Sequence, residues 1–369
     1  MMTAFSDVFA DVTKQGTKLQ TSEYLPSGKY PIIDQGQDDI AGYTDREDGL
    51  FTDVPAIIFG DHTRIVKYVD MPFFLGADGV KVLKAEIPDV DCRYLYYAVS
   101  AVKIPNTGYN RHFKWLKEAQ IPLPDISTQR RIADTLDKVS EGIGLCRKML
   151  GKLDLMVKAK FVEMFGDPTG NSFNLSVKPM TEVCEIIDGD RGKNYPNADE
   201  FSDEGYCLFL NAKNVTASGF NFDNCMYITK EKDDILRKGK LSRGDVVLTT
   251  RGTIGNLAFY TSDIPYEHMR INSGMVILRM NRKIINEVFF IEQFKMLLDD
   301  IKQKNASGSA QPQLPISAMR EINILLPDIE QQKIFSEFVA KSNKSRLTLQ
   351  QVLSKIELEQ KVLMQKYFG

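Results

Sequence analysis

The stretch that decides the fold occurs twice: residues 124–130 read PDISTQR, and residues 327–333 read PDIEQQK. The two copies lie 327 − 124 = 203 residues apart, and the same offset places Phe165-Gly166 on Phe368-Gly369. An internal repeat of this kind is sought before any local pattern because it sets the architecture of the whole chain. The sequence therefore predicts two related halves.

Each copy of the motif opens a segment that we expect to be one long helix. No proline interrupts residues 125–167 or 328–369. In the first segment, apolar residues at alternating spacings of four and three form the seam of a coiled coil: Ile132, Leu136, Val139, Ile143, Cys146, Leu150, Leu153 and Val157. The second is less regular, with Phe335, Val339, Leu349, Leu353, Ile356 and Leu363 on one face. The natural partner of each helix is the other.

Six further apolar residues lie outside this seam: Leu145, Met149, Met156, Met164, Leu347 and Met364. They would either contact a partner protein or widen the seam, and the sequence leaves both alternatives open.

The segments before the two helices differ from them in pattern. Short β-branched and aromatic runs, such as 56–59, 80–83, 246–250 and 275–278, are separated by Gly, Asp and Asn turns. Short helices are expected at 92–101 and 287–304. A second offset, 273 − 78 = 195, relates residues 78–83 to 273–278, so the halves differ by insertions and deletions.

These patterns predict an α+β fold with an internal repeat. Each half is a mixed, strand-rich domain that leads into a long coiled-coil helix. The boundaries that we expect are 1–123 for the first domain, 124–168 for the central helix, 169–326 for the second domain and 327–369 for the C-terminal helix.

Composition indicates a globular protein of the cytoplasm. The chain of 369 residues is 43% apolar and 26% charged, which suits two or three domains with real cores. We expect neither an export signal nor a membrane-spanning segment, and the five cysteines lack metal-ligand spacing. The net charge of −2 is low for a free-standing DNA binder, because phosphate neutralisation supplies much of such affinity.

The motifs of three enzyme classes are missing from the sequence. There is no Pro-Pro dipeptide for an adenine methyltransferase loop, and no phosphate-cradling P-loop. The Glu-x-Lys of a nuclease occurs at 359–361, on a predicted helix rather than a strand. Three scattered histidines make neither a zinc site nor a triad, so we expect a chain without catalytic residues or a metal.

Several segments together resemble the specificity subunits of type I restriction–modification systems. They are the two PDIxxQ(K/R) helix entries, FVEMFGDP at 161–168, GYNRHFKWL at 108–116, LTTRGTIG at 248–255 and SGSAQPQL at 307–314. The resemblance covers nearly the whole chain, and the order and duplication of the segments are more specific than any one of them.

The resemblance implies a DNA-recognition subunit in which two target-recognition domains each read one half of a bipartite, asymmetric site on double-stranded DNA. The resemblance also implies that a pseudo-twofold axis relates the two domains and that the two long helices, paired antiparallel, separate them. The helix pair would set the spacer and dock two methyltransferase subunits, with two restriction/translocase subunits completing the complex. S-adenosylmethionine, ATP and Mg²⁺ are then expected on those partners and no cofactor on this chain. No membrane partner is expected.

Base edges are read by planar hydrogen-bonding side chains, and phosphates are bound by cations. In the first half the candidates are a basic-aromatic segment, a turn and a weaker pair: Tyr109, Asn110, Arg111, His112 and Lys114; His62, Thr63 and Arg64; Gln35 and Gln37. The aromatic residues Phe113 and Trp115 would alternatively pack the junction between domain and helix.

In the second half the candidates lie in four loops: Arg191, Lys193, Asn194 and Tyr195; Lys213 and Asn214; Arg251 and Thr253; Ser307, Ser309 and Gln311. The two sets differ although the scaffolds match, which predicts two different half-sites.

Two alternative functions remain at this point. One is a specificity subunit for a related, non-translocating restriction system. The other is a duplicated coiled-coil scaffold that bridges proteins, which would explain the low net charge but not the polar loops.

Overall fold

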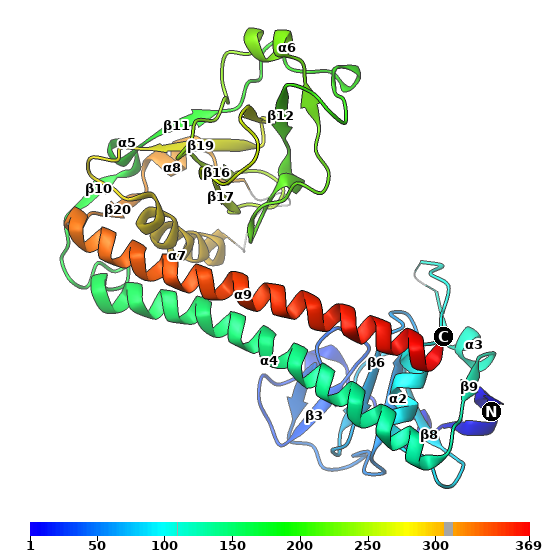
Figure 1. Ribbon diagram of the computed structural model, residues 1–369. Coiled ribbons are helices and arrows are strands. Elements are labelled where there is room, and N and C mark those ends of the chain that lie inside the picture. The colour runs from blue at the N-terminus through cyan, green and yellow to red at the C-terminus, as the bar shows by residue number, and fades with distance from the viewer. Residues whose placement is uncertain (109, 306–312) are drawn as a thin grey trace. The chain divides into compact units, whose positions relative to one another are not determined.

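The computed structural model describes residues 1–108, 110–305 and 313–369, which form two compact units. Unit 1 comprises Met1–Met149 and Leu349–Gly369, and unit 2 comprises Leu150–Thr348. The division falls inside both long helices, α4 (Ile126–Phe165) and α9 (Ile329–Phe368), each of 40 residues (Figure 1). The prediction of two long helices is confirmed.

Unit 1 is built on three small sheets. A four-stranded antiparallel sheet has the order β2-β8-β5-β6, a three-stranded sheet the order β4-β3-β7, and β1 pairs with β9. Its strands are β1 (Met2–Ala4), β2 (Phe9–Asp11), β3 (Tyr30–Ile33), β4 (Gly42–Thr44), β5 (Ala56–Gly60), β6 (Val66–Val69), β7 (Phe74–Leu75), β8 (Val80–Ala85) and β9 (Gln120–Pro122). Its shorter helices are α1 (Phe5–Val8), η1 (Thr13–Gln15), η2 (Thr21–Glu23), α2 (Cys92–Ser100) and α3 (Phe113–Lys117).

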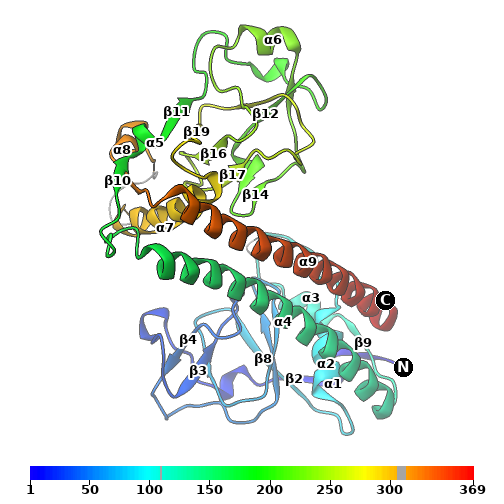
Figure 2. The same cartoon turned by 60° about the vertical axis from the view of Figure 1, so that its left-hand side comes forward.

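Unit 2 repeats this plan. Its sheets have the orders β11-β19-β16-β17 and β15-β12-β18, β10 pairs with β20, and a hairpin of β13 and β14 is added (Figure 2). Its strands are β10 (Val177–Pro179), β11 (Cys184–Asp188), β12 (Cys207–Leu210), β13 (Val215–Thr216), β14 (Gly219–Phe220), β15 (Tyr227–Ile228), β16 (Val246–Thr249), β17 (Leu257–Phe259), β18 (Met269–Ile271), β19 (Met275–Met280) and β20 (Asn323–Leu325). Its shorter helices are α5 (Met180–Val183), η3 (Ala198–Glu200), η4 (Ala212–Asn214), α6 (Lys230–Ile235), α7 (Glu287–Asn305) and α8 (Ile316–Arg320).

The glutamine of the repeated motif explains why the motif occurs twice. Gln129 is buried; its Nε2 donates to the Pro124 carbonyl (2.9 Å), and its Oε1 accepts the Asp91 N–H (3.1 Å), where α2 begins. Gln332 does the same in unit 2, joining the Pro327 carbonyl (2.8 Å) to the Asn286 N–H (2.9 Å), where α7 begins. Each glutamine thus satisfies buried backbone groups at two helix starts.

The far ends of the long helices pack in matching positions. Phe165, near the end of α4, packs edge-on against Phe289 of α7 at 5.0 Å between ring centroids. The ring centroid of Phe368, at the end of α9, lies 5.5 Å from that of Tyr94 in α2. The core of each unit therefore contains part of α4 and part of α9.

Within each unit the two helices run antiparallel. In unit 1, Gln360 Nε2 donates to Ser140 Oγ (2.9 Å), and Arg147 pairs with Glu357 (2.8 Å). In unit 2, the Phe161 and Phe335 rings meet at 5.4 Å. In these pairs the residue number on α9 decreases as the residue number on α4 increases. The predicted antiparallel pairing of the two helices is therefore confirmed.

The apolar residues outside the seam divide into two groups. Met164 and Met364 are half-buried against the cores of their units. Leu145, Met149, Met156 and Leu347 remain 43–59% exposed. Of the two groups, only Met164 and Met364 therefore extend the packing within a unit.

Candidate nucleic-acid interface

In unit 1, hydrogen bonds bring the polar loops after β3, β5 and β7 together through Gln35. Its Oε1 accepts the His62 N–H (3.1 Å), its Nε2 donates to the Asp78 carbonyl (3.0 Å), and its own carbonyl accepts from Thr63 Oγ1 (2.7 Å). The side chain of Gln35 is therefore occupied in positioning the His62–Thr63 turn.

Asp61 ties the same turn to the segment before α3. The buried residue donates its N–H to the Gly79 carbonyl (2.7 Å), and its carbonyl accepts the His112 N–H (2.7 Å). Its carboxylate Oδ1 accepts the Phe113 N–H (2.8 Å) at the start of α3. Three loops therefore meet at one residue, which fixes the backbone on which His62 is carried.

His112 is fully buried rather than presented at the surface. Its ring Nδ1 lies 3.0 Å from the Asp61 carbonyl oxygen, and the ring packs against Trp115 at 5.4 Å. The structure gives the His112 side chain no surface for a ligand, because the ring packs inside the unit.

The remaining candidates of unit 1 are more accessible. Gln37, Asn110, Arg111 and Lys114 are exposed, and Lys114 lies over the Trp115 ring at 4.1 Å. Arg64 is half-buried, with φ 63°, and its Nη1 donates to the Ile104 carbonyl (3.4 Å).

Sequence reasoning missed Lys81, which the fold places beside this cluster. Its Nζ lies 5.0 Å from the Phe113 ring centre and pairs with Asp11 at 3.0 Å. Lys81 alternates with buried residues along β8, and this strand pattern was the only signal that its side chain faces outward.

Unit 2 repeats the three-loop junction with other residues. Thr250, also buried, donates its N–H to the Gly274 carbonyl (2.9 Å), and its carbonyl accepts the Leu314 N–H (3.1 Å). Thr250 thus corresponds to Asp61, and the next residue, Arg251, corresponds to His62. The two units hold the same turn in the same way and present a different side chain on it.

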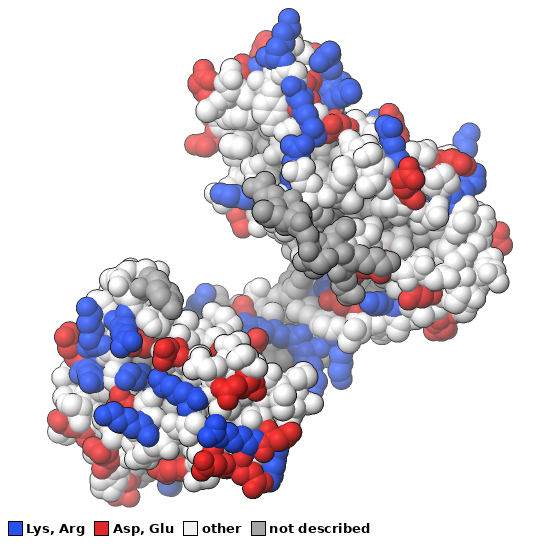
Figure 3. Space-filling model, turned by 180° about the vertical axis from the view of Figure 1, so that it is seen from behind, with Lys and Arg blue, Asp and Glu red and all other residues white. Residues whose placement is uncertain are grey.

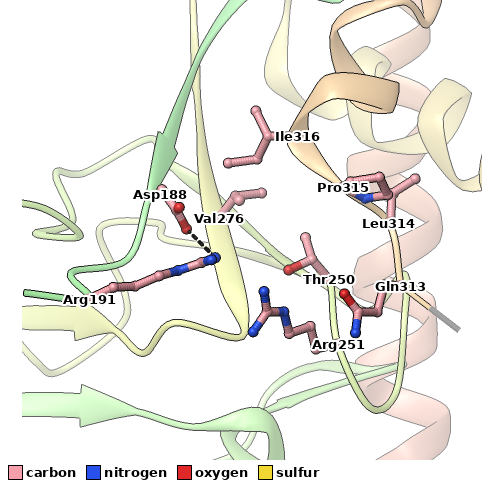
Figure 4. Close-up of a pocket in the computed structure, with 9 residues that line it drawn as sticks. All are labelled: Asp188, Arg191, Thr250, Arg251, Val276, Gln313, Leu314, Pro315 and Ile316. Carbon is pink, nitrogen blue, oxygen red and sulfur yellow. Dashed lines mark hydrogen bonds and ion pairs between the residues drawn. The ribbon is translucent and has the colours of Figure 1, made fainter. Parts of the chain in front are cut away.

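A pocket of about 200 Å³ opens beside this junction (Figure 4). Its lining residues are Asp188, Arg191, Thr250, Arg251, Val276, Gln313, Leu314, Pro315 and Ile316. Arg191 is held at one side by Asp188 (3.0 Å) and by the Ser273 carbonyl (3.2 Å). Gln313 was not among the sequence candidates because nothing in the sequence pairs it with Arg251.

The loop that carries Arg191 is fixed by a neighbouring carboxylate. Asp190 Oδ1 accepts the Gly192 N–H and its Oδ2 accepts the Arg237 N–H, both at 2.8 Å. The Gly192 bond is the main reason that the pKa of Asp190 lies below its usual range.

The other candidates of unit 2 differ in exposure. Lys193, Lys213 and Thr253 are exposed, whereas Asn194 and Tyr195 are half-buried.

Asn214 is 1% exposed, and its Nδ2 donates to the carbonyls of Asn221 (3.1 Å) and Asn224 (2.9 Å), so its side chain holds a loop. Tyr109, Ser307, Ser309 and Gln311 lie outside the described residues.

Charge on the two units is mixed. Figure 3 shows Lys and Arg side chains interspersed with Asp and Glu on the visible face of each unit. Within the described ranges, no three His, Cys, Asp or Glu residues are grouped so that they could hold one metal ion. Every helix in those ranges is too short or too polar to span a lipid bilayer.

Two stretches of the chain, residues 3–153 and 174–360, match the family model described as type I restriction modification DNA specificity domain. The chain belongs to this family. The match covers both halves, and it confirms the family resemblance that the repeated motifs carry.

Individual relatives of this specificity-domain protein agree. It is 27% identical over 145 residues to the type I restriction enzyme EcoR124I/EcoR124II specificity subunit of Escherichia coli, which is 35% of this chain and 36% of that subunit. Its fold is similar to that of the S subunit of a type I restriction–modification system from M. genitalium, with a TM-score of 0.57 at 20% identity, covering 100% of this chain and 96% of that one. A chain from a structure of type I R-M complex assembly gives a TM-score of 0.50 at 15% identity, covering 99% and 95%. The structural likenesses show a shared fold, with two strand-rich domains and two long helices.

Proposed function

We propose that this protein is the DNA-recognition subunit of a type I restriction–modification complex, in which each unit contacts one half of a bipartite, asymmetric site. One observation carries the proposal. The same three-loop junction occurs in both units, but it presents His62 in unit 1 and Arg251 in unit 2. A shared scaffold that carries a half-buried histidine in one unit and an exposed arginine in the other suits a protein that reads two different half-sites.

The junctions would favour the recognition of bases because they fix the backbone of the contacting loops before DNA binds. Loops that are already ordered lose little conformational entropy on binding, so more of the contact energy appears as affinity. Exposed cations such as Lys193 and Lys213 would bind phosphates, which positions the protein without reading bases. With a net charge of −2, the chain would depend on partner subunits for part of its affinity.

The partners would include two methyltransferase subunits, docked on the long helices. Leu145 and Met149 in unit 1, and Met156 and Leu347 in unit 2, are exposed apolar side chains on these helices. Such residues are enriched where a second protein excludes water. In this proposal the helix pair also sets the spacer between the half-sites, and two restriction/translocase subunits complete the assembly.

Catalysis would belong to those partners. Methyl transfer would use S-adenosylmethionine on the methyltransferase subunits, and translocation and cleavage would use ATP and Mg²⁺ on the restriction subunits. This chain would select the DNA sequence, and the partner subunits would carry out the reactions.

The test is to express the chain with its methyltransferase subunit in a host that lacks DNA methylation. N6-methyladenine is then mapped by single-molecule sequencing. We expect a split motif with a fixed gap, which disappears when this chain is omitted. Exchanging residues 1–123 for those of a relative should change one half of the motif only. An assembled complex that is supplied with S-adenosylmethionine and still methylates nothing would favour the protein-bridging scaffold.

A further inference from the structure

The two arginines of the pocket in unit 2 are in different states. Arg191 is bound on one side by Asp188 and by the Ser273 carbonyl. Arg251 is exposed, and among the residues that the structure describes its guanidinium makes neither a hydrogen bond nor an ion pair (Figure 4). The pocket therefore presents one guanidinium whose donors remain available.

The backbone of Arg251 is fixed although its side chain is not. Arg251 forms an isolated antiparallel bridge with Gln313, and residues that face each other in such a pair project their side chains to the same side. The preceding Thr250 is tied to Gly274 and Leu314, and Thr249 Oγ1 donates to the Thr253 carbonyl (2.5 Å). The turn that carries Arg251 is thus held on both flanks.

The surroundings also limit where the guanidinium can go. The apolar side chains of Val276 and Leu314, which are 1% and 5% exposed, line the pocket next to it. Arg191 on the far side repels a second positive charge, and Asp188 is already paired. The guanidinium therefore lines the pocket with its donors open to a ligand that has acceptor atoms.

We propose that Arg251 determines one base of the half-site contacted by unit 2, and that this base is guanine. Two guanidinium N–H groups would donate to the N7 and O6 acceptors that guanine presents in the major groove. A phosphate would also accept from arginine, but a side chain on a fixed backbone in a pocket suits the planar, two-acceptor edge of a base better than an isolated charge. This inference rests on the proposed function.

The corresponding residue of unit 1 supports a specificity role. His62 stands at the same position of the same junction, and an imidazole cannot form the two parallel donor bonds of a guanidinium. The position therefore varies between the units while its support is kept, as expected for a residue that sets the base.

The experiment compares wild-type, Arg251→Gln and Arg251→Lys proteins in the assembled methyltransferase complex, again by mapping N6-methyladenine. We expect guanine at one position of the second half-site in the wild-type motif. Arg251→Gln should reduce the preference for that guanine by roughly 5- to 150-fold, the range for one bidentate pair, while every other position is retained. Arg251→Lys should weaken the preference less, since it keeps the charge but not the fork.

Two controls separate a base contact from a charge effect. Lys193→Ala removes an exposed cation two residues after Arg191 and should lower methylation uniformly without changing the motif. His62→Ala should alter the first half-site only.

Three outcomes distinguish this inference from the proposed function. A wild-type complex that yields no split motif overturns both. A split motif that Arg251→Gln leaves unchanged overturns the assignment of Arg251 alone, and so does a second half-site without guanine.

Discussion

Replacing Asp61 by alanine tests whether the three-loop junction of unit 1 is held as described. The change removes the carboxylate that accepts the Phe113 N–H at 2.8 Å and leaves this donor without its partner. Hydrogen bonds to charged groups contribute about 1.5–3 kcal/mol, and an unsatisfied buried donor costs a similar amount. We therefore expect the free energy of unfolding of unit 1 to fall by about 2 kcal/mol. Asp61→Asn keeps an oxygen acceptor and should lose about half as much.

The chain has a built-in probe for this measurement, because Trp115 is its single tryptophan and lies in α3. Urea unfolding followed by tryptophan fluorescence therefore reports on unit 1. With a urea slope of about 2 kcal/mol/M, the midpoint for Asp61→Ala should move down by about 1 M. Thr250→Val, at the equivalent position of unit 2, should leave the fluorescence transition in place. The reasoning is refuted if the alanine and asparagine variants unfold at the wild-type midpoint.

Other substitutions probe the rest of the structure. Phe335→Ala should destabilise unit 2 by about 3–5 kcal/mol, since the ring is fully buried among phenylalanines, and circular dichroism should show an earlier melting step with the Trp115 transition unchanged. Asp190 has a lowered pKa, so its stabilisation is present above the unfolded value of about 3.9 and is lost as the pH falls through the folded value. Asp190→Asn should therefore be less stable at pH 7 but lose less stability between pH 5 and pH 3, and parallel losses in thermal melts would contradict this. Burial raises the pKa of the Cys184 and Cys207 thiols to about 12, so a thiol reagent at pH 8 should modify them only after unfolding, as peptide mapping would show.

The sequence was most informative where the signal is periodic. The repeated motif and the uninterrupted apolar spacing predicted α4 and α9, and short β-branched runs predicted β5, β8, β16 and β19 close to their observed bounds. These features depend on neighbours along the chain. The strand order shared by both units was beyond such reasoning, because it depends on pairing between distant segments.

Individual side chains were less predictable for the same reason. His112 and Asn214 were predicted to face DNA, but both are buried against backbone carbonyls of other loops. A polar residue in a loop has the same sequence signal whether it is solvated or holds the loop together. Which of the exposed candidates contact DNA stays a prediction.

Residues 349–369 belong to the same compact unit as residues 1–149, and this has a consequence for biosynthesis. The ribosome makes about 200 further residues after Met149 before Leu349 is added, which takes roughly 10–40 s at 5–20 residues per second. Throughout that interval the apolar face that Tyr94 later shares with Phe368 has no cover from α9. The first segment of unit 1 thus waits for the second before it is complete, so a chaperone has most to protect there. A nonsense mutation before codon 349 would leave unit 1 without residues 349–369.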